Sequence, residues 1–347
     1  MNDIFGLTCQ ELQAVLQPFS LPKYRAKQIA EWMYQRGATS FGDMTNLSKK
    51  LREELSSSLA IGRPRLKDRL DSADGHTTKF LLEFADGTAV ETVLMRQPYG
   101  NSICVSTQAG CNMGCAFCAS TLHGMARNLT KGEILSQAIA INDMLRGEGR
   151  GGKVDTVVIM GSGEPLMNYE NVLGFIRLLH EEYVLGLSYR SITISTSGIV
   201  PQMYKLADEG IPISLSVSLH APNQELRSEL MPINRKYPLA DVVRAARHYA
   251  ETTKRRVTYE YILIDHVNDG EAQARELVSL LRGQLASVNL IPINPVAERH
   301  LLRPSAARID WFEHYLTAHH LTVTVRREMG TDIQAACGQL RNKHLEE

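Results

Sequence analysis

The feature that most constrains the fold is a regular alternation of two hydrophobic periods after residue 100. Short apolar runs typical of β-strands alternate with longer stretches in which apolar residues recur at helical spacing. Repeated strand–helix units of about 30 residues predict a parallel sheet with helices packed outside it. The predicted strands are 102–107, 154–160, 191–197, 213–219, 257–263, 287–293 and 321–326, and the predicted helices are 131–146, 170–183, 201–208, 239–252, 271–282 and 305–319.

The fold class expected from this alternation is α/β, with the sheet either open or closed into a barrel. Ligands of such folds bind at the carboxyl ends of the strands, so we expect functional residues directly after the strands. Apolar residues at helical spacing predict helices before residue 60, and two apolar runs joined by Ala85-Asp86-Gly87 predict a β-hairpin. We expect four units: a helical domain, a β-hairpin extension, an α/β core and a C-terminal segment, at 1–62, 63–96, 97–331 and 332–347.

Composition excludes several classes of protein. The chain is 44% hydrophobic and 22% charged, as in ordinary globular proteins. It contains no run of 18 apolar residues and begins without a signal-peptide pattern, so we expect a cytoplasmic protein without a membrane partner. Six cysteines in such a chain indicate metal binding or catalysis before structural disulfides.

Positive charge is concentrated near the N-terminus although the net charge is zero. Residues 20–69 contain eleven Lys and Arg residues against five acidic residues. Such a patch attracts phosphate groups, although a solvated helical face is the simpler interpretation. Arg235-Lys236 and Lys254-Arg255-Arg256 are further candidates for phosphate contacts.

Three cysteines in a C-x3-C-x2-C pattern directly follow the first predicted strand. Cys111, Cys115 and Cys118 lie in a loop that contains Gly110 and Gly114. Three soft thiolates this close in sequence favour one metal centre. A four-iron cluster normally takes four Cys ligands, so three would leave one iron open to a substrate. The alternatives are a zinc site with His123 as fourth ligand, or reduced cysteines in the core.

The cysteine pattern resembles that of the radical SAM superfamily. The resemblance implies a partial (β/α) barrel in which Cys111, Cys115 and Cys118 hold a [4Fe-4S] cluster and S-adenosylmethionine binds the open iron. The segment MGSGEPLMN resembles the motif in which Gly163 and Glu164 contact the methionine amino group. Hydrogen bonds to ribose and carboxylate are expected at further strand ends, from Ser195, the segment Ser218-Leu219-His220, and Asn294. Each polar side chain among them could instead satisfy local backbone.

Nearly the whole chain resembles the RlmN/Cfr family of RNA methyltransferases. The segments that carry this resemblance are GCNMGCAFCAS, MGSGEPLMN, ISTSGIVP, SLHAPNQELRSELMPINRKYP, LIPINPV and RREMGTDIQAACGQLR. Within the family, the GEPL and IPINP segments are most similar to RlmN, and Cfr carries Ala where Pro165 stands here. The resemblance therefore implies methylation of adenosine C2, with C8, as in Cfr, as the alternative.

The family resemblance also implies catalytic residues that the pattern alone does not reveal. Cys337 matches the methyl carrier, and Cys104 matches the cysteine that releases the covalent adduct by forming a transient disulfide. By themselves, both would be interpreted as small buried hydrophobic residues. Glu91 matches a proton acceptor; strand alternation places it with Ala89, Val93 and Met95, where desolvation would raise its pKa. An edge or surface position is the simpler interpretation.

The implied reaction has two stages and consumes two S-adenosylmethionine molecules. Cys337 first takes a methyl group from one molecule, and a 5′-deoxyadenosyl radical from the second activates that methyl for addition to adenine. A flavodoxin- or ferredoxin-like donor supplies electrons, and either Glu91 or Cys104 accepts the proton. The implied substrate is 23S ribosomal RNA, and in some members tRNA beside the anticodon. The alternatives are a radical SAM enzyme of another class and a zinc-containing RNA-binding module.

Overall fold

The main element of the fold is a ten-stranded sheet. The computed structural model describes residues 2–149 and 152–341. Its strand order is β14-β13-β12-β11-β10-β9-β6-β5-β4-β3, so β14 and β3 form the two edges. From β6 to β14 every neighbouring pair is parallel. Those strands are β6 (Gly100–Cys104), β9 (Val154–Ile159), β10 (Ile192–Thr196), β11 (Ser214–Ser218), β12 (Val257–Leu263), β13 (Ala286–Pro292) and β14 (Val323–Val325).

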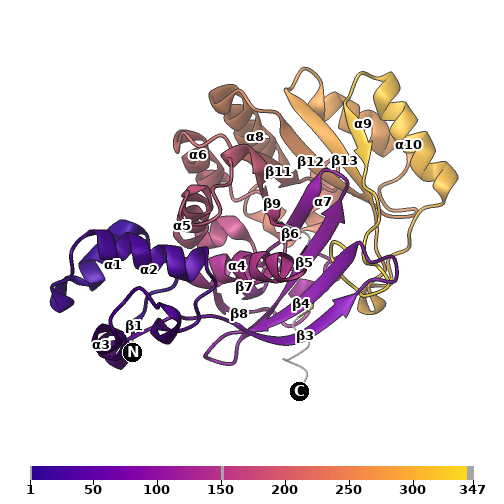
Figure 1. Ribbon diagram of the computed structural model, residues 1–347. Coiled ribbons are helices and arrows are strands. Elements are labelled where there is room, and N and C mark those ends of the chain that lie inside the picture. Colours follow the sequence, from indigo (N-terminus) through magenta and orange to yellow (C-terminus); the bar gives the residue numbers. More distant parts are fainter. Residues whose placement is uncertain (1, 150–151, 342–347) are drawn as a thin grey trace.

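Helices follow the parallel strands and cover the outside of the sheet (Figure 1). They are α4 (Lys131–Gly147), α5 (Tyr169–His180), α6 (Val200–Asp208), α8 (Leu239–Thr253), α9 (Glu271–Leu281) and α10 (Ala306–Ala318). The expected α/β architecture, a partial barrel with its strands in parallel, is therefore confirmed. Local sequence fixes where helices begin: in α4, Thr130 and Glu133 form a capping box that satisfies the first free N–H groups.

The predicted β-hairpin is part of the same sheet. Strands β3 (Arg65–Asp71), β4 (Thr77–Glu83) and β5 (Ala89–Gln97) are antiparallel, and β5 pairs with β6. Strand β3 was not predicted because all its residues are exposed, which leaves no apolar alternation to detect. Other short elements were not predicted either, among them β7 (Gln108–Gly110), β8 (Met125–Asn128) and α7 (Gln224–Leu230).

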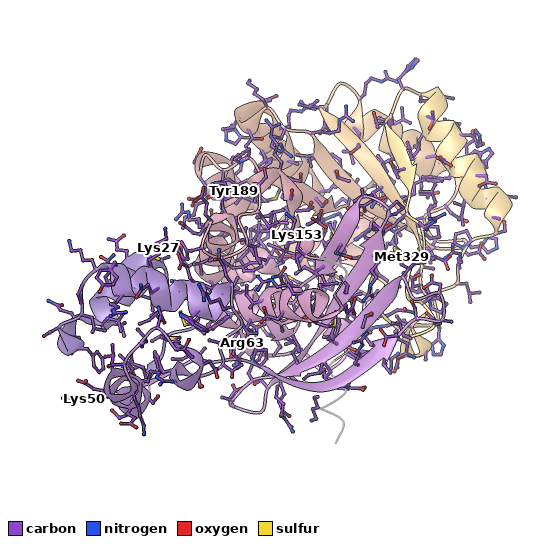
Figure 2. All side chains as sticks on the ribbon, viewed as in Figure 1. Lys27, Lys50, Arg63, Lys153, Tyr189 and Met329 are labelled. Carbon is purple, nitrogen blue, oxygen red and sulfur yellow. The ribbon has the colours of Figure 1, made fainter. Side chains whose placement is uncertain are left out.

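Three helices near the N-terminus form the predicted helical region beside the barrel (Figure 1). They are α1 (Cys9–Val15), α2 (Tyr24–Tyr34) and α3 (Lys49–Ser58), and β1 (Asn2–Asp3) pairs with β2 (Leu59–Ala60). Arg63 forms an ion pair with Asp143 of α4, and Figure 2 shows Arg63 at the junction with the barrel. Gly6 lies so close to Gly132 that a Cβ on Gly6 would be 2.3 Å from the Gly132 Cα.

No helix in the described ranges is both long enough and apolar enough to cross a membrane.

Candidate functional site

The three motif cysteines lie together at the carboxyl ends of the strands. Cys111 and Cys115 are buried, Cys118 is half-buried, and all three border one cavity of about 160 Å³, called here the first cavity. Gly110 shapes the start of the loop, because its φ is +81° and a Cβ there would lie 1.9 Å from the Gly124 carbonyl oxygen. Burial raises the pKa of Cys111 to about 12.

The donor set fits an iron–sulfur cluster better than a single ion. In the described residues no three His, Cys, Asp or Glu side chains are close enough together to hold one metal ion. His123, the fourth ligand of the zinc alternative, is exposed and is not among the residues that line the first cavity. In a cubane each thiolate binds a different iron, which requires cysteines around a cavity and soft sulfur donors. Cys111, Cys115 and Cys118 provide both.

Glu164 gives the first cavity a buried negative group. Its Oε1 accepts hydrogen bonds from Thr196 Oγ1 at 2.8 Å and Leu166 N–H at 3.0 Å, and its Oε2 accepts one from Ser197 N–H at 2.7 Å. Burial raises the pKa of Glu164, and these donors oppose that effect. No Lys or Arg of the described chain forms an ion pair with it, so a ligand's ammonium group would complete the site.

Gly163 precedes this carboxylate and has a φ of +107°. A Cβ at this position would lie 2.6 Å from the Gln108 Cβ, so the loop packs as it does only with glycine here. The predicted pair Gly163-Glu164 therefore borders the first cavity as expected for a cofactor site.

The other predicted cofactor residues divide between two cavities. Ser195, Ser218 and His220 line the first cavity, whereas Asn294 lines a second one. Leu219 is fully buried, and its N–H donates to the Glu260 carbonyl oxygen at 3.0 Å. Burial lowers the pKa of His220 to about 3, so the ring is neutral, and its Nδ1 accepts the N–H of Ile262 at 3.0 Å.

The second cavity contains the two remaining candidate cysteines. Its volume is about 410 Å³, and both Cys104 and Cys337 border it. Cys337 and Cys118 also border the first cavity, so the two cavities are neighbours and both residues lie in the wall of each. Asn294 Nδ2 donates to the Cys337 carbonyl oxygen at 3.0 Å and fixes that position. Burial raises the pKa of Cys104 to about 12, and all six cysteines are free thiols.

Glu91 lies on the expected face of β5, but it is not surrounded by apolar groups alone. Lys79 Nζ lies 3.0 Å from Glu91 Oε1, and both side chains are buried. Glu91 also accepts a hydrogen bond from the N–H of Arg341. It is not among the residues that line either cavity. The structure thus places Glu91 next to the C-terminal segment, held by a cation that the strand pattern did not reveal.

Two buried charged residues, Arg227 and Glu260, lie next to the first cavity and were not predicted as site residues. Arg227 is fully buried and donates to the carbonyl oxygens of Ser197 and Ser218, which joins the loops after β10 and β11. Glu260 borders the first cavity and accepts from Asn289 Nδ2 at 2.7 Å. Glu260 was detectable as the single acidic residue in an otherwise apolar and aromatic strand, whereas Arg227 sits in a polar helix that gives no such signal.

The predicted phosphate contacts lie in three different places. Arg235 and Lys236 are exposed after α7, and Figure 2 shows Lys50 on α3 pointing away from the protein. Residues 254–256 directly precede β12, and Arg255 donates to Ser214 at the start of β11. This triplet is therefore at the amino ends of the strands, opposite the cysteines.

Comparison with known proteins identifies the family. The model of the radical SAM superfamily matches residues 105–278, and that of the "Ribosomal RNA large subunit methyltransferase N-terminal domain" matches residues 2–61. A Symbiobacterium thermophilum protein, described as a probable dual-specificity RNA methyltransferase RlmN, is 52% identical and covers 97% of this chain and 91% of its own. A Geobacillus kaustophilus protein with the same description is 48% identical and covers 100% and 94%.

A solved structure agrees with these relatives. The crystal structure of a radical SAM methyltransferase from Sphaerobacter thermophilus superposes with a TM-score of 0.95 at 45% identity, covering 99% of this chain and 100% of that one. The matched length includes the helical N-terminal region as well as the barrel. The chain therefore belongs to the radical SAM superfamily and, within it, to the RlmN family of RNA methyltransferases.

Proposed function

We propose that this enzyme methylates C2 of an adenosine in 23S ribosomal RNA through a methyl-cysteine intermediate on Cys337 and a 5′-deoxyadenosyl radical. The observation that carries the proposal is the position of Cys337. It borders both the cavity of the three motif cysteines and the cavity that contains Cys104. A sulfur at this junction reaches the methyl donor on one side and an acceptor on the other. The relatives' names describe a dual-specificity RNA methyltransferase, which supports a second RNA substrate, and we propose tRNA for it.

The first cavity would hold the cluster and S-adenosylmethionine. Cys111, Cys115 and Cys118 are the proposed cluster ligands, and the bound cluster supplies the electron that cleaves S-adenosylmethionine to the 5′-deoxyadenosyl radical. The buried Glu164 carboxylate would bind the ammonium group of the methionine part. Ser195, Ser218 and His220 line the same cavity and would contact its ribose and adenine, with Leu219 and Asn294 positioning the surrounding loops.

Cys337 and Cys104 would perform the steps at sulfur. Adenine C2 is not a nucleophile, so direct displacement at a sulfonium fails there, whereas a Cys337 thiolate displaces S-adenosylhomocysteine and retains the methyl group. A second S-adenosylmethionine is consumed when hydrogen is removed from that methyl, which then adds to the adenine ring. The adduct would give one electron back to the bound cluster and lose the C2 proton to Cys104 or Glu91. Cys104 would then attack the Cys337 sulfur, which breaks the bond between that sulfur and the adenine CH2 group; the CH2 group would take up a proton and leave as the methyl group of methyladenosine, with a Cys104–Cys337 disulfide left on the enzyme. A reductant then restores both thiols.

The remaining assignments follow from the same family membership. The electron donor would be a flavodoxin- or ferredoxin-like protein, and the enzyme would work in the cytoplasm. Residues 1–62 would form an RNA-binding domain, 63–96 the β-hairpin extension, 97–331 the radical SAM core and 332–347 the carrier segment. Residues 342–347 of that segment lie outside the described residues.

Nucleoside mass spectrometry tests the proposal. The reconstituted enzyme is incubated with S-adenosylmethionine, reduced flavodoxin and 23S ribosomal RNA that lacks adenine methylation, and 2-methyladenosine is separated from 8-methyladenosine. We expect 2-methyladenosine from the wild type, none from Cys337→Ala, and an unchanged yield from Cys9→Ala. Cys9 is the matched control because it is a half-buried thiol in α1, and the residues that line the two cavities do not include it.

Two results would contradict the proposal. The appearance of 8-methyladenosine would instead assign the protein to the Cfr-type reaction. Product formation by Cys337→Ala would show that the carrier sulfur is elsewhere, because no other step in the scheme transfers the methyl group.

A further inference from the structure

We propose that the Arg299 guanidinium is a counter-ion of the iron–sulfur cluster and raises its reduction potential. This inference rests on the proposed function and extends it to a positioning residue outside both cavities. Arg299 contacts the cysteine loop, and within the described residues its charge is not paired with a carboxylate. A cluster held by three thiolates would supply the missing negative charge.

Arg299 lies at the end of a short helical turn after β13. The turn spans Ala297–Arg299 and is followed by His300 in the left-handed region, with a φ of 41°. The backbone N–H of Arg299 donates to the carbonyl oxygen of the buried Val296 at 2.9 Å, which fixes where the side chain starts. Arg299 is half-buried and is not among the residues that line either cavity. It therefore contacts the cysteine loop away from the cavity walls.

The side chain of Arg299 contacts the last cysteine of the motif. Its Nη2 donates to Thr121 Oγ1 at 2.8 Å and to the Cys118 carbonyl oxygen at 3.4 Å. Thr121 Oγ1 donates in turn to the same Cys118 carbonyl oxygen at 2.9 Å. The positive charge also lies within electrostatic range of the Cys118 sulfur. The guanidinium is thus next to one of the three proposed cluster ligands.

The charge of Arg299 is not neutralised within the described part of the chain. The neighbouring carboxylate of Glu298 lies within electrostatic range, but it pairs with Arg341 Nη1 at 2.7 Å. Arg299 Nε is buried and has no hydrogen-bond partner among these residues. A partly buried charge without a counter-ion costs free energy. This arrangement is explained if the counter-ion is a group that binds to the cysteine loop.

The cysteine loop becomes anionic when it holds a cluster. Three thiolates outweigh the charge of an oxidised four-iron core by one unit, and one-electron reduction adds a second unit of negative charge. A nearby cation therefore stabilises the reduced form more than the oxidised form, which raises the reduction potential. A cluster with a higher potential accepts an electron more readily from a given donor.

Arg227 is a second cation near the cysteine loop, but it is less suited to a test. It lies within electrostatic range of Cys115. Its guanidinium also donates to the carbonyl oxygens of Ser197 and Ser218 and so joins two loops of the barrel. Its replacement would disturb the fold around the first cavity, whereas Arg299 contacts only the cysteine loop through its side-chain hydrogen bonds.

A redox titration followed by electron paramagnetic resonance tests the inference. The full-length cluster-loaded protein, without S-adenosylmethionine, is titrated anaerobically with dithionite in the presence of redox mediators. We expect Arg299→Gln to make reduction about tenfold less favourable, which lowers the midpoint potential of this one-electron couple by about 59 mV. Arg299→Lys retains the charge and should keep a potential close to that of the wild type.

Two further variants separate the charge of Arg299 from its hydrogen bond and from net charge. Arg303→Gln removes the same charge from an exposed position further along the loop, where Glu328 neutralises it. Thr121→Val removes the hydroxyl that accepts from Arg299 and retains the guanidinium. Both should lower the potential much less than Arg299→Gln does. An unchanged potential in Arg299→Gln, or an equal fall in Arg299→Lys, Arg303→Gln or Thr121→Val, would overturn the inference.

The iron content of the variants decides the case in which Arg299→Gln binds the cluster poorly. If Arg299→Gln takes up less iron than the wild type and Arg299→Lys takes up as much, the charge itself helps to hold the cluster, as expected of a counter-ion. If both variants lose iron alike, Arg299 only shapes the loop and the inference is wrong. If the wild type itself binds no iron, the proposed function fails, and the inference fails with it.

Discussion

The buried Glu91 carboxylate on β5 contacts the Lys79 ammonium group and the N–H of Arg341. Glu91 pairs with Lys79 on the neighbouring strand, and Lys79 Nζ also donates to the Gln334 carbonyl oxygen at 3.2 Å. Glu91 in turn accepts the N–H of Arg341. The ion pair thus contacts the C-terminal segment on both sides of Cys337. A buried pair contributes little net stability as a whole, but the loss of one partner leaves a buried charge unpaired.

We expect Lys79→Met to lower the free energy of unfolding by about 3 kcal/mol, because it removes a cation that lies 3.0 Å from a buried carboxylate. Urea unfolding measures this loss. Lys67→Met is the matched control on the same hairpin, because Lys67 pairs with Glu83 at 3.3 Å in a more exposed position and its loss should cost under about 1 kcal/mol. The double variant Lys79→Met with Glu91→Met should regain most of the stability. Equal losses in the two single lysine variants would contradict this account of the pair.

Individual residues differed in how far the sequence could predict them. The closeness of the three motif cysteines was predictable, because they lie in one short sequence pattern and line one cavity. Glu164 was predicted only through the family resemblance, and it lines the same cavity. Lys79, the partner of Glu91, was not predictable, because the two side chains come together only when β4 pairs with β5. Cys104 and Cys337 come from segments far apart in sequence and line one cavity only in the folded protein.

The elements of the barrel follow from hydrophobic periodicity more closely than the rest of the fold does. Strands β9 to β13 and their helices lie within a few residues of the predicted ranges, because each buries an apolar face that the sequence displays. The edge strand β3 could not be predicted, because all its residues are exposed, and the sequence did not show that the predicted hairpin joins the same sheet as the barrel strands.

Helix α3 carries three cations close together, and their effect on RNA binding is expected to be the sum of their charges. Lys49 and Lys50 are exposed, and Arg52 donates to the Gly42 carbonyl oxygen at 2.7 Å, which orients it at the surface. We expect the triple variant Lys49→Gln, Lys50→Gln and Arg52→Gln to weaken binding to 23S ribosomal RNA and to lower the salt slope by about 2. Filter binding across KCl concentrations measures both quantities.

The control for the α3 variant replaces two cations at the amino ends of the barrel strands. Lys254 and Arg256 are exposed before β12, at the amino ends of the strands. Replacing both with Gln should leave the salt slope unchanged, since RNA that reaches Cys337 approaches from the carboxyl ends. A slope that falls equally in both sets would mean that net charge alone, and not α3, determines RNA binding.

The motif cysteines, Cys104 and Cys337 all lie at one end of the partial barrel. Cysteines from the loop after β7, polar groups after β9, β10 and β11, and the carrier segment after β14 surround two cavities that share Cys118 and Cys337. The rule that ligands bind at the carboxyl ends of parallel strands predicted this end of the sheet. It did not predict two cavities, because their common wall is formed by a segment that returns from the far edge of the sheet.

The central claim is that three cysteines hold a four-iron cluster with one iron open to S-adenosylmethionine. The most direct test is electron paramagnetic resonance of anaerobically reconstituted and reduced protein, together with its iron content, before and after S-adenosylmethionine is added. We expect about four irons per chain and a changed cluster spectrum on addition, with the cluster lost in Cys111→Ala and kept in Cys9→Ala. Protein without iron, or a cluster spectrum that S-adenosylmethionine leaves unchanged, would contradict the account.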